Sequence, residues 1–311
     1  MNIYRDITEL PLFKNAIITI GTFDGVHNGH RQILNQLIEE ANEVDGTPVV
    51  ITFYPHPKQI VGNDLSSVLV LNTLEEKSAL LAEVGIEHLV VVPFTKEFAE
   101  QSAEDYIKNF LVRSFKPHTI IIGYDHRFGK NRAGNYELLE VKGQEFNYKV
   151  KEIPEHILHN ITISSTKIRT QLLEGNISTA NELLGYDYFF SGNVITGKQL
   201  GRTIGFPTAN LAINNESKLI PGNGVYAVTV QIENDKTIFN GMMNIGVRPT
   251  FEKTERTIEV NIFDFDSSIY DKQLTVHIKT RLRDEMKFDG IDSLKNQLNR
   301  DREMAISQLT N

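Results

Sequence analysis

Cysteine is absent from this chain of 311 residues, which excludes disulfides, a thiolate metal site and a cysteine nucleophile. Positive charge is scarce: 32 Lys and Arg residues stand against 40 Asp and Glu residues, and the net charge of −8 argues against DNA or RNA as a partner. No apolar run approaches the length of a membrane span, and residues 1–13 lack the basic and apolar blocks of a signal peptide. We therefore expect a cytoplasmic protein without a nucleic-acid or membrane partner, and the oligomeric state stays open.

The first half of the chain has the pattern of an α/β domain. Short β-branched runs alternate with amphipathic helices, which is typical of a parallel sheet covered on both faces. The expected strands cover residues 16–20, 49–53, 89–94 and 119–124, and the expected helices include 74–84, 102–115, 166–174 and 178–185. On such a sheet, ligands bind at the carboxyl ends of the strands.

The pattern changes near Tyr188, so we expect one domain at residues 1–186 and a second at 187–311. A chain of this length can form two domains with cores of their own. Strand-like runs now follow one another without helices, at 190–195, 224–233, 237–243, 257–263 and 274–279. They predict an antiparallel barrel or sandwich, closed by a helix over about 293–309.

The densest motif lies between the first strand and the first helix and reads Gly21-Thr22-Phe23-Asp24-Gly25-Val26-His27-Asn28-Gly29-His30. Its glycines allow a tight turn and a close approach to a ligand. His27 and His30 stand at the start of the helix, where free N–H groups and the helix dipole favour an anion. The motif therefore predicts a phosphate site. It is not a Walker loop, since Gly-Lys-Ser/Thr is missing, and its glycine spacing is not that of a dinucleotide fingerprint.

The segment from His27 to His30 resembles the HxGH motif of the nucleotidyltransferase superfamily, and GTFDGVHNGH as a whole resembles the bacterial bifunctional riboflavin kinase/FAD synthetase family. An isolated Gly-x-x-His pair would more often be structural, but ten specified positions between a strand and a helix favour a ligand site. The resemblance implies a Rossmann-like domain that transfers the adenylyl group of ATP to FMN, with Mg²⁺ bridging the phosphates. The ATP site that it implies includes Gly21, Phe23, Asp24, His27 and His30, and the two histidines are its catalytic residues.

Three further stretches of the first domain match this family. The helix start at 163–169 resembles the ISSTxIR motif, although hydroxyls at a helix start commonly serve only as caps. The resemblance assigns ATP binding to Ser164, Ser165, Thr166 and Arg169, with Arg169 also catalytic, and flavin binding to Phe53, His56, Pro57, Asp125 and Phe128. One departure is visible, because His126 stands where the family usually has Phe. Its ring could still stack on an aromatic ligand.

The second dense motif runs from Gly197 to Asn210 (GKQLGRTIGFPTAN) and resembles the GRxxGFPTAN motif of riboflavin kinases. Its three glycines predict a flexible loop that wraps a ligand, and Lys198 and Arg202 are candidate phosphate donors. The resemblance implies a riboflavin kinase barrel with an ATP site at Gly201, Arg202, Thr203 and Gly205, Mg²⁺ ligands at Thr208 and Asn210, and a catalytic base at Glu259. Without the kinase motif, Glu259 would be interpreted as a surface carboxylate on an edge strand.

The resemblance spans nearly the whole chain and implies two successive reactions, from riboflavin and ATP to FMN and then from FMN and ATP to FAD and pyrophosphate. Two alternatives stay open. A monofunctional FAD synthetase with a degenerate second domain is disfavoured by intact residues in both motifs, namely His27, His30, Arg169, Thr208, Asn210 and Glu259. A flavin-binding regulator would keep the fold and bind flavin, but would release neither ADP nor pyrophosphate.

Overall fold

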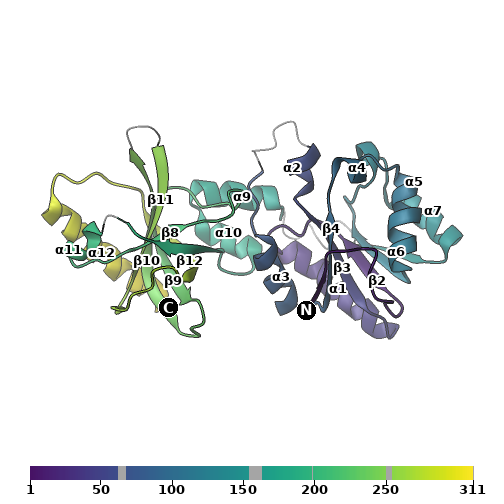
Figure 1. The fold of residues 1–311 in the computed structure, drawn as a ribbon, viewed down its shortest axis with the longest axis horizontal. Helices are drawn as coiled ribbons and strands as arrows, with labels where there is room; N and C mark the ends of the chain where they lie inside the picture. Colours follow the sequence, from purple (N-terminus) through teal and green to yellow (C-terminus); the bar gives the residue numbers. More distant parts are fainter. Residues whose placement is uncertain (62–67, 154–162, 198, 250–253, 311) are drawn as a thin grey trace. The chain divides into compact units, whose positions relative to one another are not determined.

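The computed structural model describes residues 1–61, 68–153, 163–197, 199–249 and 254–310, which form two compact units, Met1–Ser165 and Thr166–Asn311 (Figure 1). No helix in these described ranges is long and apolar enough to cross a membrane. Lys198, a candidate phosphate donor, lies outside the described residues.

The first unit is built on a parallel sheet of six strands in the order β1-β4-β3-β2-β5-β6. The strands are β1 (Asn2–Tyr4), β2 (Ile17–Ile20), β3 (Pro48–Tyr54), β4 (His88–Pro93), β5 (Thr119–Gly123) and β6 (Lys149–Ile153). The four central strands confirm the sequence prediction. The two edge strands were not predicted, because they are short or polar and only partly buried, so they lack the apolar run that marks a central strand.

Helices cover both faces of this sheet. On one side lies α1 (Asn28–Glu43), which packs against β2, β3 and β5. Helix α3 (Leu74–Glu83) begins with a capping box formed by Thr73 and Glu76. The remaining helices of this unit are α2 (Pro57–Val61), α4 (Lys96–Ala99), α5 (Ala103–Asp105), η1 (Tyr106–Val112), α6 (Arg113–Phe115), η2 (Lys130–Arg132) and α7 (Tyr136–Phe146).

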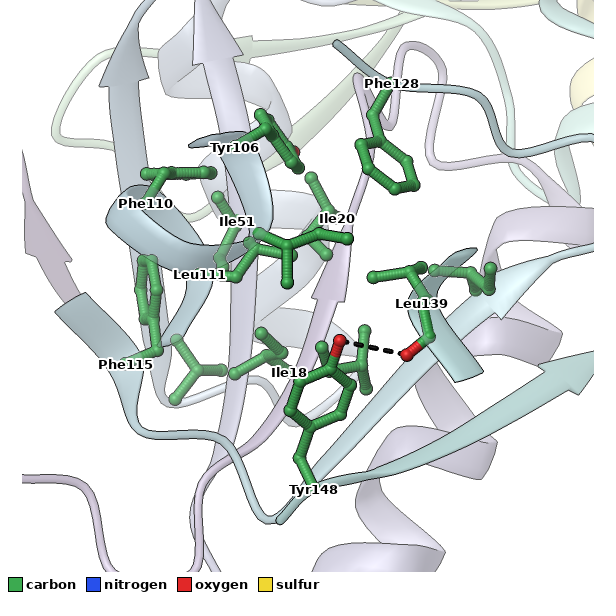
Figure 2. Packing of buried hydrophobic residues seen from close by; sticks show 14 of the residues in the cluster. Ile18, Ile20, Ile51, Tyr106, Phe110, Leu111, Phe115, Phe128, Leu139 and Tyr148 are labelled. Carbon is green, nitrogen blue, oxygen red and sulfur yellow. Dashed lines mark hydrogen bonds between the residues drawn. The ribbon is translucent and has the colours of Figure 1, made fainter. Parts of the chain in front are cut away.

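The helix predicted over 102–115 is present, but its middle is π-helical. Ser102 caps its start by accepting the N–H of Asp105 (3.0 Å), and the π-helix η1 follows directly. Figure 2 shows how Tyr106, Phe110 and Phe115 of this segment pack on alternate residues of the strands, such as Ile18 and Ile20. A hydrogen bond also joins two residues of this core, because the Tyr148 hydroxyl donates to the Leu139 carbonyl (2.9 Å). Burial of these large side chains stabilises the unit.

The second unit contains a closed antiparallel barrel in the order β10-β11-β8-β7-β12-β9, so the predicted barrel or sandwich is a barrel. Its strands are β7 (Phe189–Ile195), β8 (Ala209–Ala212), β9 (Gly224–Ile232), β10 (Ile238–Pro249), β11 (Thr254–Ile262) and β12 (Gln273–Arg283). Strand β8 was not predicted. It has four residues and lies within a motif that reads as a ligand-binding loop, yet it is needed to close the barrel between β7 and β11.

The barrel unit also includes α9 (Ser165–Glu174, from its second residue onward), α10 (Ile177–Leu184), α11 (Leu200–Thr203) and the closing helix α12 (Ile291–Leu309). Helix α10 joins the barrel through Asn181, whose side-chain amide donates to the Ile278 carbonyl (2.9 Å) and accepts the Tyr188 N–H (2.8 Å). The compact units thus divide at Ser165, upstream of the domain boundary at 186/187, which stays a prediction.

Helix α12 is anchored to β12 by a buried ion pair. Arg283 donates from Nε to Oδ1 of Asp301 (2.8 Å) and from Nη2 to Oδ2 (2.6 Å). The Asp301 side chain is 0% exposed, and the Gln297 amide donates to Oδ1 as well (2.9 Å). Two parallel bonds between a guanidinium and a carboxylate fix orientation as well as distance, so this pair sets the position of the helix on the barrel.

Candidate functional site

The GTFDG turn lies where the strand order of the sheet reverses. It follows β2, which pairs with β3 on one side and with β5 on the other. Ligands of open parallel sheets bind at such a switch point, beyond the carboxyl ends of the strands. The turn after β2 and the Gly123-Tyr124-Asp125 loop after β5 therefore leave adjacent strands at the same end of the sheet.

The backbone of this turn is unusual. Gly25 has a φ of 90°, and Phe23 and Val26 also have positive φ values of 46° and 34°. A β-branched residue rarely adopts this conformation, and such strain persists only where the surrounding structure enforces it. Both side chains are buried, so core packing holds the turn in this shape.

Two sets of hydrogen bonds connect the turn to neighbouring elements of the same unit. The Thr22 carbonyl accepts the Thr52 hydroxyl of β3 (3.1 Å) and the Lys77 ammonium of α3 (2.8 Å). The buried Asp24 carboxylate accepts the backbone N–H of Leu71 (2.9 Å) and that of Asn72 (3.3 Å). The Asp24 side chain therefore fixes the loop before α3 to the turn.

The two motif histidines stack on each other at the start of α1. Their ring centroids are 3.6 Å apart with an interplanar angle of 14°. His27 is the N-cap, because its Nδ1 accepts the His30 backbone N–H (3.3 Å). With Nδ1 as acceptor, the neutral tautomer of His27 carries its proton on Nε2, which is then a donor. A side chain at Gly29 would meet the His27 ring at 3.3 Å, so glycine lets the ring lie across the helix start.

His30 is held neutral by its surroundings. Burial, followed by the nearby His27 and Lys77, keeps the pKa of His30 well below its usual value. The ring of Phe23 packs against the ring of His30, with the two centroids 5.2 Å apart. Among the residues that the structure describes, none offers a hydrogen-bond partner to the buried Nδ1 of His30. A neutral imidazole with an unsatisfied ring nitrogen at a helix N-terminus can therefore contribute to a phosphate site by hydrogen bonding.

The predicted ISSTxIR residues are divided between the two units. Ser165 reaches the turn, because its hydroxyl donates to the Asp24 carbonyl (2.9 Å). Ser164 precedes it at the end of the first unit, whereas Thr166 and Arg169 belong to the second. The structure thus brings Ser165 and Asp24 together, and the assignments of Ser164, Thr166 and Arg169 stay predictions.

The predicted flavin residues Phe53 and Phe128 belong to one aromatic cluster. Phe128 stacks on Tyr106 with centroids 5.0 Å apart, and Phe53 lies 5.7 Å from Phe98, which itself contacts Tyr106 at 5.9 Å. Figure 2 shows Phe128 next to Tyr106 at the rim of the core. Nearby Pro57 is the first residue of α2, where its missing N–H costs nothing. Phe128 and Tyr106 are buried, whereas Phe53 and Phe98 are half-buried, so the accessible part of the cluster belongs to the latter two.

His56 and Asp125, the other predicted flavin residues, lie in loops. Nδ1 of His56 accepts the Lys58 N–H (3.2 Å), so this ring orients the start of α2. Asp125 is exposed and next to His126, whose pKa falls to about 4 because burial disfavours its charged form. The His126 ring lies 5.8 Å from Phe128, and its buried Nε2 has no hydrogen-bond partner within the described part of the chain.

In the barrel, the structure brings the predicted metal ligands and base together. Strand β8 pairs with β11 so that Asn210 stands opposite Glu259. The Thr208 hydroxyl donates to Oε2 of the half-buried Glu259 (3.3 Å). A side chain at Gly197 would come within 2.2 Å of the Asn210 amide, so the loop needs glycine there. Hydroxyl, amide and carboxylate oxygens are the ligands that Mg²⁺ prefers.

The other predicted ATP residues of the barrel lie on the loop that contains α11. Arg202 and Thr203 are exposed on this short helix, and Gly205 has a φ of 85° with open space around its Cα. At Gly201, a side chain would collide with the Phe206 carbonyl at 2.1 Å, because the Phe206 N–H bonds back to the Gly201 carbonyl (2.8 Å). The loop is thus folded back on the start of the Pro207–Asn210 segment.

Sequence reasoning missed two polar residues that support these sites. Lys77 lies in an amphipathic helix, where a lysine is usually solvated, and Asn261 lies within a strand two residues after Glu259. Asn261 stands two residues after Glu259, whereas Lys77 lies outside every motif and carried no signal in the sequence. Both are 7% exposed and both bond to a backbone carbonyl of a motif, at Thr22 and at Pro207.

Fold and site together define a protein with an HxGH-type nucleotidyltransferase unit and a phosphotransferase-type barrel. A family model for FAD synthetase matches residues 11–167, and one for riboflavin kinase matches residues 184–309. A bifunctional riboflavin kinase/FMN adenylyltransferase from Bacillus subtilis (strain 168) is 36% identical over 301 residues, covering 95% of this chain and 93% of the relative. Its counterpart from Escherichia coli (strain K12) is 35% identical over 297 residues, covering 96% and 93%.

A solved structure agrees on the fold. A crystal structure described as a macrolide-efflux protein from Streptococcus pneumoniae has a TM-score of 0.88 and 31% identity, and the match covers 98% of both chains. That description belongs to that protein. With two family models in chain order and relatives matched over nearly their full length, this chain belongs to the family of bifunctional riboflavin kinase/FMN adenylyltransferases.

Proposed function

We propose that this chain makes FAD from riboflavin in two steps, each of which uses one ATP. The barrel unit transfers the γ-phosphoryl group of ATP to riboflavin and releases FMN and ADP. The α/β unit transfers the adenylyl group of a second ATP to FMN and releases FAD and pyrophosphate. What supports the proposal is that each unit brings predicted site residues together, His27 and His30 as a stacked pair in one and Thr208 with Glu259 in the other.

In the adenylyl transfer, a phosphate oxygen of FMN attacks the α-phosphorus of ATP, and the bond from that phosphorus to the bridging oxygen of pyrophosphate breaks. Such a step depends on positioning and on stabilisation of charge, with no covalent enzyme intermediate. The Nε2–H of His27, the neutral His30 and the backbone N–H groups at the start of α1 serve as donors to the phosphates. Gly21, Phe23 and Asp24 shape the turn that holds them.

The remaining residues predicted for the adenylyl transfer complete its two substrate sites. Ser164, Ser165, Thr166 and Arg169 supply further donors to the triphosphate. The flavin ring packs on the cluster that contains Phe53 and Phe128, with His56, Pro57 and Asp125 at its edge. What supports this arrangement is that the cluster borders the loops after β3 and β5, beside the histidine turn.

In the kinase step, the primary hydroxyl of the ribityl chain attacks the γ-phosphorus while Glu259 takes its proton, and ADP leaves. A carboxylate held by a hydroxyl hydrogen bond suits a general base. Thr208 and Asn210 would hold Mg²⁺, since the Thr208 hydroxyl donates to Glu259 and Asn210 stands opposite Glu259 in the β8–β11 pair. When bound, the ion neutralises phosphate charge. Gly201, Arg202, Thr203 and Gly205 form the loop over the ATP.

The test is a time course of the purified protein with riboflavin and Mg-ATP, in which FMN, FAD, ADP and pyrophosphate are separated and quantified. We expect FMN to rise first and FAD to follow, with ADP and pyrophosphate released in step. A flavin-binding regulator would bind riboflavin without forming either nucleotide product, and a monofunctional enzyme would form only one of them.

Two variants separate the sites. His30→Ala should let FMN accumulate with little FAD, because it removes a phosphate donor of the α/β unit only. Glu259→Ala should abolish FMN formation while FMN supplied directly is still converted to FAD. Unchanged FAD output from His30→Ala would overturn the adenylyl-transfer assignment, and loss of both activities in Glu259→Ala would mean that the variant is misfolded.

A further inference from the structure

Lys77 is a buried lysine that contacts the GTFDG turn, the segment that we propose binds phosphate. It lies on α3 (Figure 1) after Leu74-Glu75-Glu76, in a helix that begins with a capping box, and its side chain is only 7% exposed. Lysine is almost never buried to this degree unless its ammonium has partners. The partners of Lys77 therefore say what the residue is for.

The acceptors of the Lys77 ammonium are neutral and belong to the site. Nζ donates to the Thr22 carbonyl (2.8 Å) and to the Thr52 hydroxyl (3.4 Å), and the same hydroxyl donates to the Thr22 carbonyl (3.1 Å). The Thr22 carbonyl thus receives donors from α3 and from β3 at once. It belongs to the second residue of the GTFDG turn, between the strand end and the strained Phe23.

The positive charge of the Lys77 ammonium is energetically unfavourable in this buried position. Burial lowers its pKa to about 8, and the Asp24 carboxylate opposes that shift from a distance. The Asp24 carboxylate itself accepts the backbone N–H groups of Leu71 and Asn72. A buried ammonium with a carbonyl and a hydroxyl as acceptors is poorly compensated until another anion approaches. The nearest predicted anion is the triphosphate above the turn.

We propose that Lys77 is a positioning residue of the adenylyl-transfer site. Its ammonium fixes the Thr22 carbonyl and so the shape of the turn from Gly21 to Gly25, and it supplies positive potential beneath the phosphates that the turn binds. The proposal rests on the adenylyl-transfer function of the α/β unit. It assigns a role in phosphate binding to a residue outside the histidine motif and on another helix.

The test compares Lys77→Met with the full-length wild type. Methionine has nearly the length of lysine and suits a buried position, so replacing the buried charge should leave the thermal midpoint unchanged or raise it. The affinity for inorganic pyrophosphate, measured by calorimetry, should fall about tenfold to a hundredfold, and the KM for ATP in FAD formation should rise to match, as for a lost hydrogen bond to a charged group. Phosphorylation of riboflavin by the same sample should be unaffected.

Matched controls make the result specific. Lys14→Met is the same substitution on an exposed lysine of the same unit and should change none of these quantities. Thr52→Val removes the second donor to Thr22 and keeps the charge, so it should weaken pyrophosphate binding by about threefold to tenfold. If Lys77→Met does not fold, the Thr52→Val result decides whether the Thr22 carbonyl positions the phosphates.

A Lys77→Met protein that binds pyrophosphate and ATP like the wild type would overturn the proposal. So would a lower thermal midpoint with an unchanged KM for ATP, because that result describes a purely structural lysine. If the wild type itself forms no FAD from FMN, the adenylyl-transfer function is wrong. That failure is distinct, because it is seen before any variant is compared.

Discussion

Asn261 offers a sharp test of the kinase site. Its side chain is 7% exposed on β11, and its amide donates to the Pro207 carbonyl (2.7 Å). The Pro207 carbonyl belongs to the peptide that precedes Thr208, whose hydroxyl meets Glu259 at 3.3 Å. Asn261 and Glu259 are two residues apart on one strand, so a single strand carries the proposed base and the side chain that we expect to position the segment opposite it.

The size of the effect follows from this hydrogen bond. Asn261→Leu keeps the volume but removes the donor, and a buried carbonyl left without its partner costs about 1–3 kcal/mol. If the loss of this hydrogen bond displaces Thr208 from Glu259 and the same free energy is added to the activation barrier, kcat/KM for riboflavin phosphorylation should fall roughly fivefold to a hundredfold. Asn261→His is the matched control, because its ring Nδ1 lies the same number of bonds from Cβ as the asparagine amide nitrogen and can donate in its place. It should recover most of the loss.

The assay measures initial rates of FMN formation at varied riboflavin, ATP and Mg²⁺, and conversion of supplied FMN to FAD in the same preparation. We expect Asn261→Leu to lower the rate of FMN formation and to raise the Mg²⁺ concentration that gives the half-maximal rate. The rate of FAD formation should not change. If the kinase rate and its Mg²⁺ dependence stay as in the wild type, Asn261 does not position the Thr208 segment. If both activities fall together, its role is in folding.

Three further predictions concern single groups. Arg283→Met leaves the fully buried Asp301 carboxylate unpaired, so the barrel unit should lose about 3–5 kcal/mol of unfolding free energy in a denaturant titration, and a loss below about 1 kcal/mol would contradict the anchoring of α12. A double variant with Asp301→Leu should recover stability. The pKa of His126 is depressed to about 4, so its stabilising contribution is present above its unfolded value of 6.5 and is lost as the pH falls towards 4. Wild type should therefore lose about 2 kcal/mol more than His126→Phe between about pH 7 and about pH 5, and parallel pH profiles would show that this ring is not buried as described. For Tyr106, Tyr106→Leu should raise the KM for FMN in FAD formation several-fold by removing the ring that supports Phe128, without changing riboflavin phosphorylation.

Local patterns were sufficient for much of the architecture. The β-branched runs of β2 to β5 are buried on both faces, so their sequences are apolar throughout and are recognised without knowledge of their neighbours. The same holds for His27 and His30, because a helix start and its cap are determined within a few residues. Apart from β8, the barrel strands were predicted with boundaries that differ by up to six residues, and β10 and β12 proved longer than their apolar runs.

Other features depend on contacts between distant segments. The π-helical turn from Tyr106 to Val112 has the composition of an ordinary helix, and its packing beneath the sheet distinguishes it. Strand β8 has four residues, too few for a periodic signal, and it is recognisable only through its pairing with β7 and β11. Lys77 and Asn261 looked like surface or strand residues because nothing in their own segments marks their acceptors, Thr22 and Pro207.

The sequence by itself determined the two-unit plan, the helix and strand types, and the residues that carry the phosphate and kinase motifs, since propensity, periodicity and glycine turns act over short stretches. Tertiary structure alone decided the strand order that puts β2 beside β5, the closure of the barrel, and the buried donors that hold each motif in shape. Those features arise from pairings between residues in different segments of the chain, such as Lys77 with Thr22, 55 positions apart, and Arg283 with Asp301, 18 positions apart. The desolvation cost of these pairs is offset only when the whole unit has folded around them.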